Sequence, residues 1–180
     1  IKGYEHLFGR ALNILCALEL IPNLIRNYPI YVYSAHNVVV EKIKEINKKH
    51  NLLIEYSSRY NQVSHDELLG KFVKAKISIG NNVSDGVPNT LLEALICGAF
   101  PIQSNPGGAS EDYIENGVNG FLINDPENIE EIANHITEAI NNSDLINKAF
   151  EINQQKAKEL EYSKIKRKLL NAYKQIEKEL

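Results

Sequence analysis

Two acidic side chains in one short segment are the first residues that could do chemistry. Asp85 and Glu93 have seven residues between them and lie in the segment SDGVPNTLLEAL, residues 84–95. Gly86 relaxes the backbone there, and Pro88 suits the first position of a helix, because the N–H that it lacks would be unpaired anyway. The pattern predicts a helix N-terminus flanked by carboxylates. The alternative is that Asp85 only caps the helix and that Glu93 is a surface or paired carboxylate.

The same helix N-terminus predicts a site for phosphate. The backbone amides of Asn89, Thr90 and Leu91 would point outward, unpaired, at the positive end of the helix dipole. A terminus of this kind suits a phosphate oxygen. We therefore expect an anionic ligand at this turn.

A second loop that could contact a ligand spans residues 104–123. Gly107-Gly108 permits a close approach of the backbone and could supply amides as an anion-binding nest, with Glu111 on the helix that follows. A tight turn without a ligand is the alternative for the glycine pair. The later Asn116-Gly117 and Asn119-Gly120 pairs are typical of structural turns.

Short strands and helices alternate along most of the chain, and these elements must position the two loops. Apolar, β-branched runs predict strands over 30–35, 52–57, 77–80, 100–103 and 120–124. Helical spacing predicts helices over 5–20, 38–49, 65–75, 89–97 and 127–141, followed by two terminal helices over about 144–160 and 163–179. This alternation favours parallel βαβ units and a doubly wound α/β sheet in a single domain, residues 1–180. Ligands bind such sheets beyond the carboxyl ends of the strands.

Local signals mark the starts of two of these helices. Ser64 and Glu67 form a capping box before the helix at 65–75. Asp125, Pro126 and Glu127 are expected to open the helix at 127–141. The Lys- and Glu-rich terminal helices are expected to present a solvated face.

Composition excludes several classes of protein. The 180 residues are 43% hydrophobic and 24% charged, as in an ordinary globular domain, and the net charge of −3 argues against a nucleic-acid binder. Cys16 and Cys97 are expected to be buried free thiols in a reducing compartment, with a single bridge between them as the alternative, and no metal-binding cysteine pattern occurs. No apolar run reaches the roughly 18 residues of a membrane span, and no signal peptide is recognised. We expect a cytoplasmic protein, with the inner face of the membrane as a second location.

Several motifs in register carry a resemblance to a known family. Residues 64–123 resemble the donor-binding half of GT-B retaining glycosyltransferases of group 1, family 4. The shared features are Asp85-x7-Glu93, the segment EALICGAFP that begins at Glu93, the Gly107-Gly108-x-x-Glu111 loop and the Asn-Gly turn before a strand. The resemblance implies a Rossmann-like domain, the C-terminal half of a GT-B architecture. It also implies a nucleotide-sugar donor, UDP-, GDP- or ADP-linked, with no cofactor and no metal.

The resemblance assigns expected roles to the residues of the first loop. Glu93 would accept hydrogen bonds from the ribose hydroxyls, and Asp85 would face the hydroxyls of the donor sugar. The amides of Thr90 and Leu91 would hold the distal phosphate. The family usually has Glu where Asp85 stands and often has Gly where Pro88 stands. We take both departures as signs of an altered donor choice, and an inactive homologue is the alternative.

Further roles fall on other loops. Lys2 and Arg10 match loosely the two cations that neutralise the leaving diphosphate, whose negative charge grows as the glycosidic bond breaks. The alternatives are a solvated terminus for Lys2 and a surface ion pair for Arg10. In the family, the nucleobase is usually recognised by the loop after the third strand. With the truncated strand at residues 1–3 counted as the first, this is the loop at 58–63, so the resemblance implies base stacking by Arg59 or Tyr60. His36 faces the same rim, where a structural or solvated histidine is the more usual case.

The expected function is transfer of a sugar from a nucleotide-sugar donor to a glycan or lipid-linked acceptor, in polysaccharide or glycoconjugate assembly. The chain contains no methionine, and Ile1-Lys2-Gly3 resembles the tail of a truncated first strand. We therefore expect an acceptor-binding domain upstream, and a fragment that binds donor without turning it over alone. The alternatives are a nucleotide-sugar epimerase of the same architecture and a non-catalytic module whose terminal helices dock a partner.

Overall fold

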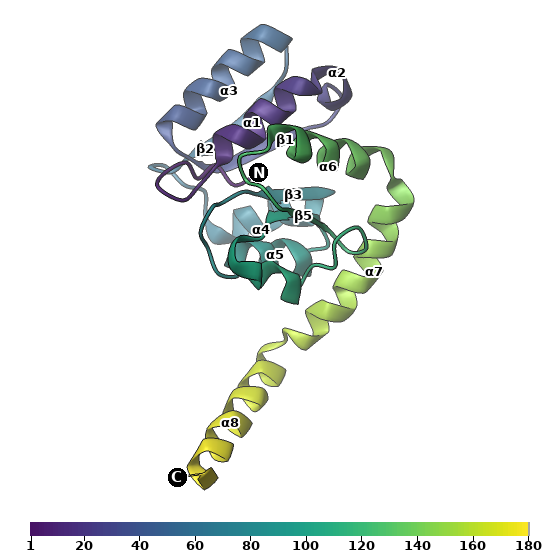
Figure 1. The fold of residues 1–180 in the computed structure, drawn as a ribbon. Coiled ribbons are helices and arrows are strands. Elements are labelled where there is room, and N and C mark those ends of the chain that lie inside the picture. The colour runs from purple at the N-terminus through teal and green to yellow at the C-terminus, as the bar shows by residue number, and fades with distance from the viewer. Residues whose placement is uncertain (180) are drawn as a thin grey trace.

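A parallel β-sheet between two layers of helices is the frame of the protein (Figure 1). The computed structural model describes residues 1–179. The strands are β1 Ile30–Ala35, β2 Ile54–Ser58, β3 Ile77–Gly80, β4 Phe100–Ser104 and β5 Phe121–Ile123. The helices are α1 Ala11–Leu20, α2 Pro22–Ile25, α3 Asn37–His50, α4 His65–Lys74, α5 Asn89–Ile96, α6 Ile129–Asn141, α7 Ser143–Glu159 and α8 Tyr162–Glu179, with a 3-10 helix, η1, over Pro106–Asp112. The predicted α/β fold is confirmed.

The first three residues join the two parts of the sheet. β1 pairs with β2, and β3 pairs with β4 and then β5, all in parallel. Residues 1–3 lie between β1 and β3: the Lys2 amide donates to Ile79 O at 3.0 Å, and the Gly3 amide donates to Tyr33 O at 2.8 Å. Counting residues 1–3 as the first strand, the strand order is 3-2-1-4-5-6, the order of a Rossmann fold. The predicted doubly wound sheet is therefore correct.

Apolar side chains fill both interfaces between the sheet and its helices. The main core is made by buried residues of α1, α3, α6 and the strands: Ile14, Leu15, Leu18, Val32, Ile43, Ile46, Ile102, Ile123, Ile132 and Ile136. On the other face Tyr33 of β1 meets Phe72 of α4 edge to face, with ring centroids 5.6 Å apart. Fully burying one such aliphatic or aromatic side chain contributes about 1.5–3 kcal/mol. The core therefore holds the carboxyl ends of the strands in fixed positions.

Two predicted helix starts are wrong, and hydrogen bonds explain both. α1 begins at Ala11 rather than at residue 5, because residues 4–9 form a loop in which Glu5 Oε2 accepts from the Leu12 amide at 2.8 Å. α6 begins at Ile129, because Asn128 is the cap and its Oδ1 accepts from the Glu131 amide at 3.0 Å. By contrast, Ser64 caps α4 as predicted.

The last two helices differ in their packing, and α7 contacts α5 and β4. α7 runs down one side of the molecule, and α8 extends away from it (Figure 1). From residue 162 to 177, α8 is exposed except at the half-buried Lys164. Its exposed large apolar side chains are Tyr162, Ile165, Leu169, Leu170, Tyr173 and Ile176. Within residues 1–179, no helix combines the length and the apolarity that crossing a membrane requires. Cys16 and Cys97 are free thiols, as predicted, but both are only partly buried rather than buried.

Candidate functional site

The loops that carry the predicted site residues gather where residues 1–3 and β3 end side by side. In the Rossmann strand order, β1 and β2 lie between residues 1–3 and one edge of the sheet, whereas β4 and β5 lie between β3 and the other edge. The connections that follow residues 1–3 and β3 turn to opposite faces of the sheet, where α1 and α5 pack in separate clusters. Open α/β sheets bind ligands at such a switch point, and we refer to it as the crevice. The loop after residues 1–3 and the loop from β3 to α5 both open there.

Lys2 and Asp85 meet at this crevice. Lys2 Nζ lies 3.8 Å from Asp85 Oδ2, and Asn82 Nδ2 donates to the same carboxylate oxygen at 3.3 Å. Asn82 is buried, and its amide donates to Ser104 Oγ at 2.8 Å, which ties the loop to the end of β4. The structure therefore holds Asp85 Oδ2 from two directions, while the side chain stays 36% exposed.

The N-terminus of α5 offers fewer free amides than expected. Pro88 is the cap of α5 rather than its first helical residue, and its carbonyl accepts from the Leu91 amide at 2.9 Å. The prediction that the Leu91 amide is unpaired is therefore wrong, because a cap residue's carbonyl accepts the first bonds of the helix. Among residues 1–179, no acceptor pairs with the amides of Asn89 and Thr90. These two donors remain for an anion.

Glu93 lies one turn further into α5 and has a partner from another helix. His65 Nε2, at the start of α4, lies 2.9 Å from Glu93 Oε1. The Glu93 side chain is 27% exposed. The predicted alternative of a paired carboxylate is thus found in the free protein, and one carboxylate oxygen remains without a hydrogen bond from the described residues.

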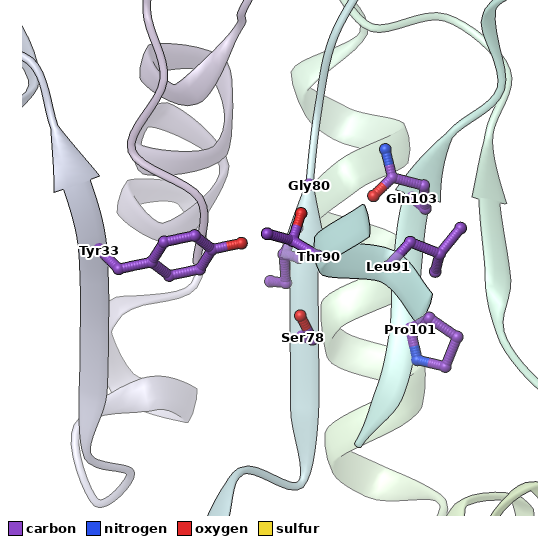
Figure 2. A pocket seen from close by; sticks show the side chains of 8 residues that line it. Tyr33, Ser78, Gly80, Thr90, Leu91, Pro101 and Gln103 are labelled. Atoms are coloured by element: carbon purple, nitrogen blue, oxygen red, sulfur yellow. The ribbon is translucent and has the colours of Figure 1, made fainter. Parts of the chain in front are cut away.

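Tyr33 anchors the start of α5 to the sheet. Its hydroxyl is hydrogen-bonded to Thr90, and Figure 2 shows the phenol pointing from β1 toward that residue, beside a small pocket between α5 and the sheet that Leu91 and Gln103 also line. Burial raises the pKa of Tyr33 far above its usual value, and the nearby Glu93 carboxylate raises it further. The phenol is therefore neutral and structural at physiological pH.

Arg10 lies at the same end of the sheet but is held by another carboxylate. Its backbone amide donates to Asn81 O at 2.9 Å, which fixes the start of α1 beside the end of β3. Its guanidinium forms an ion pair with Glu127 and donates to Gly9 O at 2.8 Å. The pKa of Glu127 is lowered by the hydrogen bond from Arg10 and by a second one from Asn13. The predicted alternative for Arg10, a surface ion pair, describes the free protein.

The Gly107-Gly108 pair forms an exposed turn inside η1. Both residues have positive φ, +72° and +79°, and a Cβ on either would meet nothing within 4 Å. Asn105 organises the turn: its Oδ1 accepts from the Ser110 amide at 3.0 Å, and its Nδ2 donates to Glu111 at 2.6 Å. The turn needs glycine for its backbone conformation, and it leaves open space in front of it.

The proposed base-stacking residues lie on the rim. Tyr60 is 76% exposed, and the Arg59 guanidinium lies 5.3 Å from the centroid of the Tyr4 ring. His36 has a structural role, since its Nδ1 accepts from the Glu5 amide at 2.8 Å. Burial lowers the pKa of His36, and the charges of Arg59 and His6 lower it further.

Three residues of the crevice escaped sequence reasoning: Asn82, His65 and Tyr33. Asn81-Asn82 directly follows the strand ISIG, so two buried amides at a carboxyl strand end were a signal that could have been used. His65 and Tyr33 contact α5 from distant parts of the sequence, and no local sequence pattern predicts such contacts. Residues 1–179 contain no group of three or more His, Cys, Asp or Glu side chains arranged to hold a metal ion.

A comparison with protein families decides the identity. The model of the family described as glycosyl transferases group 1 matches residues 39–159, more than half of the chain. The chain belongs to the group 1 glycosyl transferases. This confirms the family resemblance seen in the motifs. The curated proteins contain no match to the chain.

Solved structures share the fold of this group 1 glycosyl transferase chain. A glycosyltransferase from Rickettsia africae is similar with a TM-score of 0.73 and 24% identity, over 92% of this chain and 44% of that protein. TarM gives 0.71 and 19% identity, over 94% and 33%. HepE from Anabaena, solved in complex with UDP, gives 0.72 and 14% identity, over 97% and 48%. The chain thus spans less than half the length of each of these proteins.

Proposed function

We propose that this chain is the donor-binding half of a retaining, metal-independent glycosyltransferase. It would bind a nucleotide sugar, whose sugar the whole enzyme transfers to a glycan or lipid-linked acceptor during polysaccharide or glycoconjugate assembly. An N-terminal domain, facing the crevice, would supply the acceptor site. The expected location is the cytoplasm, with the inner face of the membrane as the alternative.

The single observation that carries the proposal is the convergence at the crevice of a cation, two acids and two free helix amides. Lys2 and Asp85 meet at 3.8 Å, and Glu93 lies on the helix whose first amides are unpaired. Two solved structures of similar fold, HepE and TarM, are recorded in complexes with UDP. These observations favour a ligand with a diphosphate and several hydroxyl groups.

The proposed mechanism is electrostatic. As the bond between the sugar and the diphosphate breaks, negative charge grows on the leaving nucleoside diphosphate. Lys2 and the amides of Asn89 and Thr90 would stabilise that charge, since donors fixed in advance need no reorganisation during the reaction. Asp85 would accept from the sugar hydroxyls and orient the ring, and Glu93 would accept from the ribose. Arg10 would assist after leaving Glu127.

Calorimetric titration of the chain with UDP, GDP and ADP tests the proposal. We expect measurable heat with at least one nucleotide and no sugar transfer by the chain alone. A flat titration with all three nucleotides would contradict the donor site. Acceptor-dependent transfer by these residues alone would contradict the assignment of a half-enzyme.

A further inference from the structure

The contact between His65 and Glu93 joins two helices at the mouth of the crevice. His65 is the first residue of α4, and its Nε2 lies 2.9 Å from Glu93 Oε1 on α5. The imidazole is 63% exposed, while the carboxylate that it contacts is 27% exposed. The imidazole is therefore the more solvent-exposed member of the pair, and the carboxylate is the more buried one.

The His65 side chain contributes little that the fold needs. Ser64 supplies the cap of α4, accepting at its Oγ from the Glu67 amide at 3.2 Å. Across residues 1–179, the only hydrogen bond or ion pair of the His65 side chain is the one with Glu93. An ion pair as exposed as this one adds little to the free energy of folding. The more specific effect of the contact is therefore the one on the Glu93 carboxylate.

What the contact does is fix the direction of a carboxylate. A glutamate carboxylate has two oxygens and about four acceptor positions. His65 occupies one position on Oε1, so that Oε2 and the remaining position on Oε1 stay available. A pair of neighbouring hydroxyls, such as those of a ribose, donates two hydrogen bonds to such a group. Holding a flexible side chain in its binding orientation beforehand reduces the entropy that binding must overcome.

We propose that His65 positions the Glu93 carboxylate for the ribose hydroxyls of a nucleoside diphosphate. The proposal rests on the proposed function, because it takes Glu93 as the ribose acceptor. His65 acts through Glu93 and is a positioning residue, with no direct part in sugar transfer. Its effect on affinity must therefore depend on both Glu93 and the ribose hydroxyls.

A double-mutant cycle measures that dependence. UDP, GDP and ADP are titrated into the chain, and the nucleotide that binds tightest is used with His65→Ala, Glu93→Ala and the double variant. We expect His65→Ala to weaken binding about 3–10-fold and to have no further effect once Glu93 is alanine. His65→Gln, whose amide can donate from a similar position, should keep the affinity within about twofold of the parent. The 2′,3′-dideoxy form of the same nucleotide should bind His65→Ala and the parent chain equally.

The controls separate positioning from folding. Asp66→Ala changes the neighbouring exposed residue of α4 and should leave the affinity unchanged. All variants should share the thermal unfolding midpoint of the parent. Additive losses from the two alanine variants, or equal losses for the ribose and dideoxy nucleotides, would overturn the role of His65 alone. Absence of binding to every nucleotide by the parent chain would overturn the proposed function, and this inference with it.

Discussion

Lys2 Nζ lies 3.8 Å from Asp85 Oδ2, so that the central segment of the sheet and the loop after β3 meet through a cation and a carboxylate. The two residues are far apart in the sequence, and the parallel pairing of residues 1–3 between β1 and β3 brings them together. In the free protein, each side chain partly neutralises the other. A diphosphate at the crevice would compete with Asp85 for Lys2, and a sugar hydroxyl would find Asp85 already oriented by Asn82.

Replacing Lys2 tests its role as the cation of the site. Lys2→Gln should weaken the binding of nucleoside diphosphates about tenfold, because a charge-assisted contact to phosphate is lost. The binding of the corresponding nucleoside, which has no phosphate, should not change. Calorimetry of both ligands measures the difference. Lys44→Gln is the control, since Lys44 is exposed on α3 and pairs with Glu41. Equal losses for the nucleoside and the diphosphate would contradict the role.

Replacing Glu93 tests the ribose acceptor. Glu93→Ala should weaken nucleotide binding by about 1–3 kcal/mol, the free energy of charge-assisted hydrogen bonds that are no longer made. Glu130→Ala, at an exposed position in the first turn of α6, serves as the control and should bind as the parent chain does. The dissociation constants come from the same titrations. An unchanged affinity for Glu93→Ala would refute the ribose contact.

The elements that sequence predicts well are those with a local cause. β1 and β3 have the expected bounds, because short β-branched runs between polar loops suit buried strands. Ser64 caps α4 as its spacing from Glu67 indicates. The start predicted for α6 at Asp125-Pro126-Glu127 was wrong, because Asp125 accepts from the Glu127 amide two residues on, in a turn before the helix, and Asn128 caps the helix.

The side-chain partners within the site could not be predicted, because they come from distant parts of the chain. Arg10 was expected to face a diphosphate, and in the free protein it pairs with Glu127 of the loop before α6. His65 reaches Glu93 only because α4 and α5 pack side by side. Spacing identifies which residues could carry chemistry, whereas tertiary packing decides which of them meet.

The glycine pair in η1 predicts a contrast in stability. Gly107→Ala should lower the free energy of unfolding by about 1–2 kcal/mol, because a residue with a side chain is disfavoured at a φ of +72°. The added Cβ would meet nothing within 4 Å, so no clash contributes to this loss. Gly86→Ala is the matched control: its Cβ would also meet nothing within 4 Å, and its φ is not in the left-handed region, so the stability should stay nearly unchanged. Urea unfolding measures both variants. Equal stability of the two would contradict a conformational requirement at Gly107.

Glu19 predicts a dependence of stability on pH that is separate from the site. Burial alone would raise the pKa of this α1 carboxyl, but hydrogen bonds from Lys42 and Lys49 of α3 outweigh that effect and lower the pKa to about 2. Since the ordinary value is near 4.5, the folded state favours the ionised form. The resulting stability is fully present above about pH 4.5 and is lost as the pH falls toward 2.

Glu19→Gln should therefore lower the free energy of unfolding by about 1–3 kcal/mol at pH 7. The difference in free energy of unfolding between the parent chain and the variant should shrink below pH 4.5. There the Glu19 carboxyl of the parent takes up a proton on unfolding, so the parent loses the stability that the ionised carboxylate contributes. Glutamine contributes no such stability at any pH. Urea unfolding at pH 7, 4 and 3 measures the trend. Glu45→Gln is the control: this carboxylate also pairs with Lys42, but it is 59% exposed and should contribute little at any pH. A difference for Glu19→Gln that stays constant from pH 7 to pH 3 would show that the lost stability does not come from the charge.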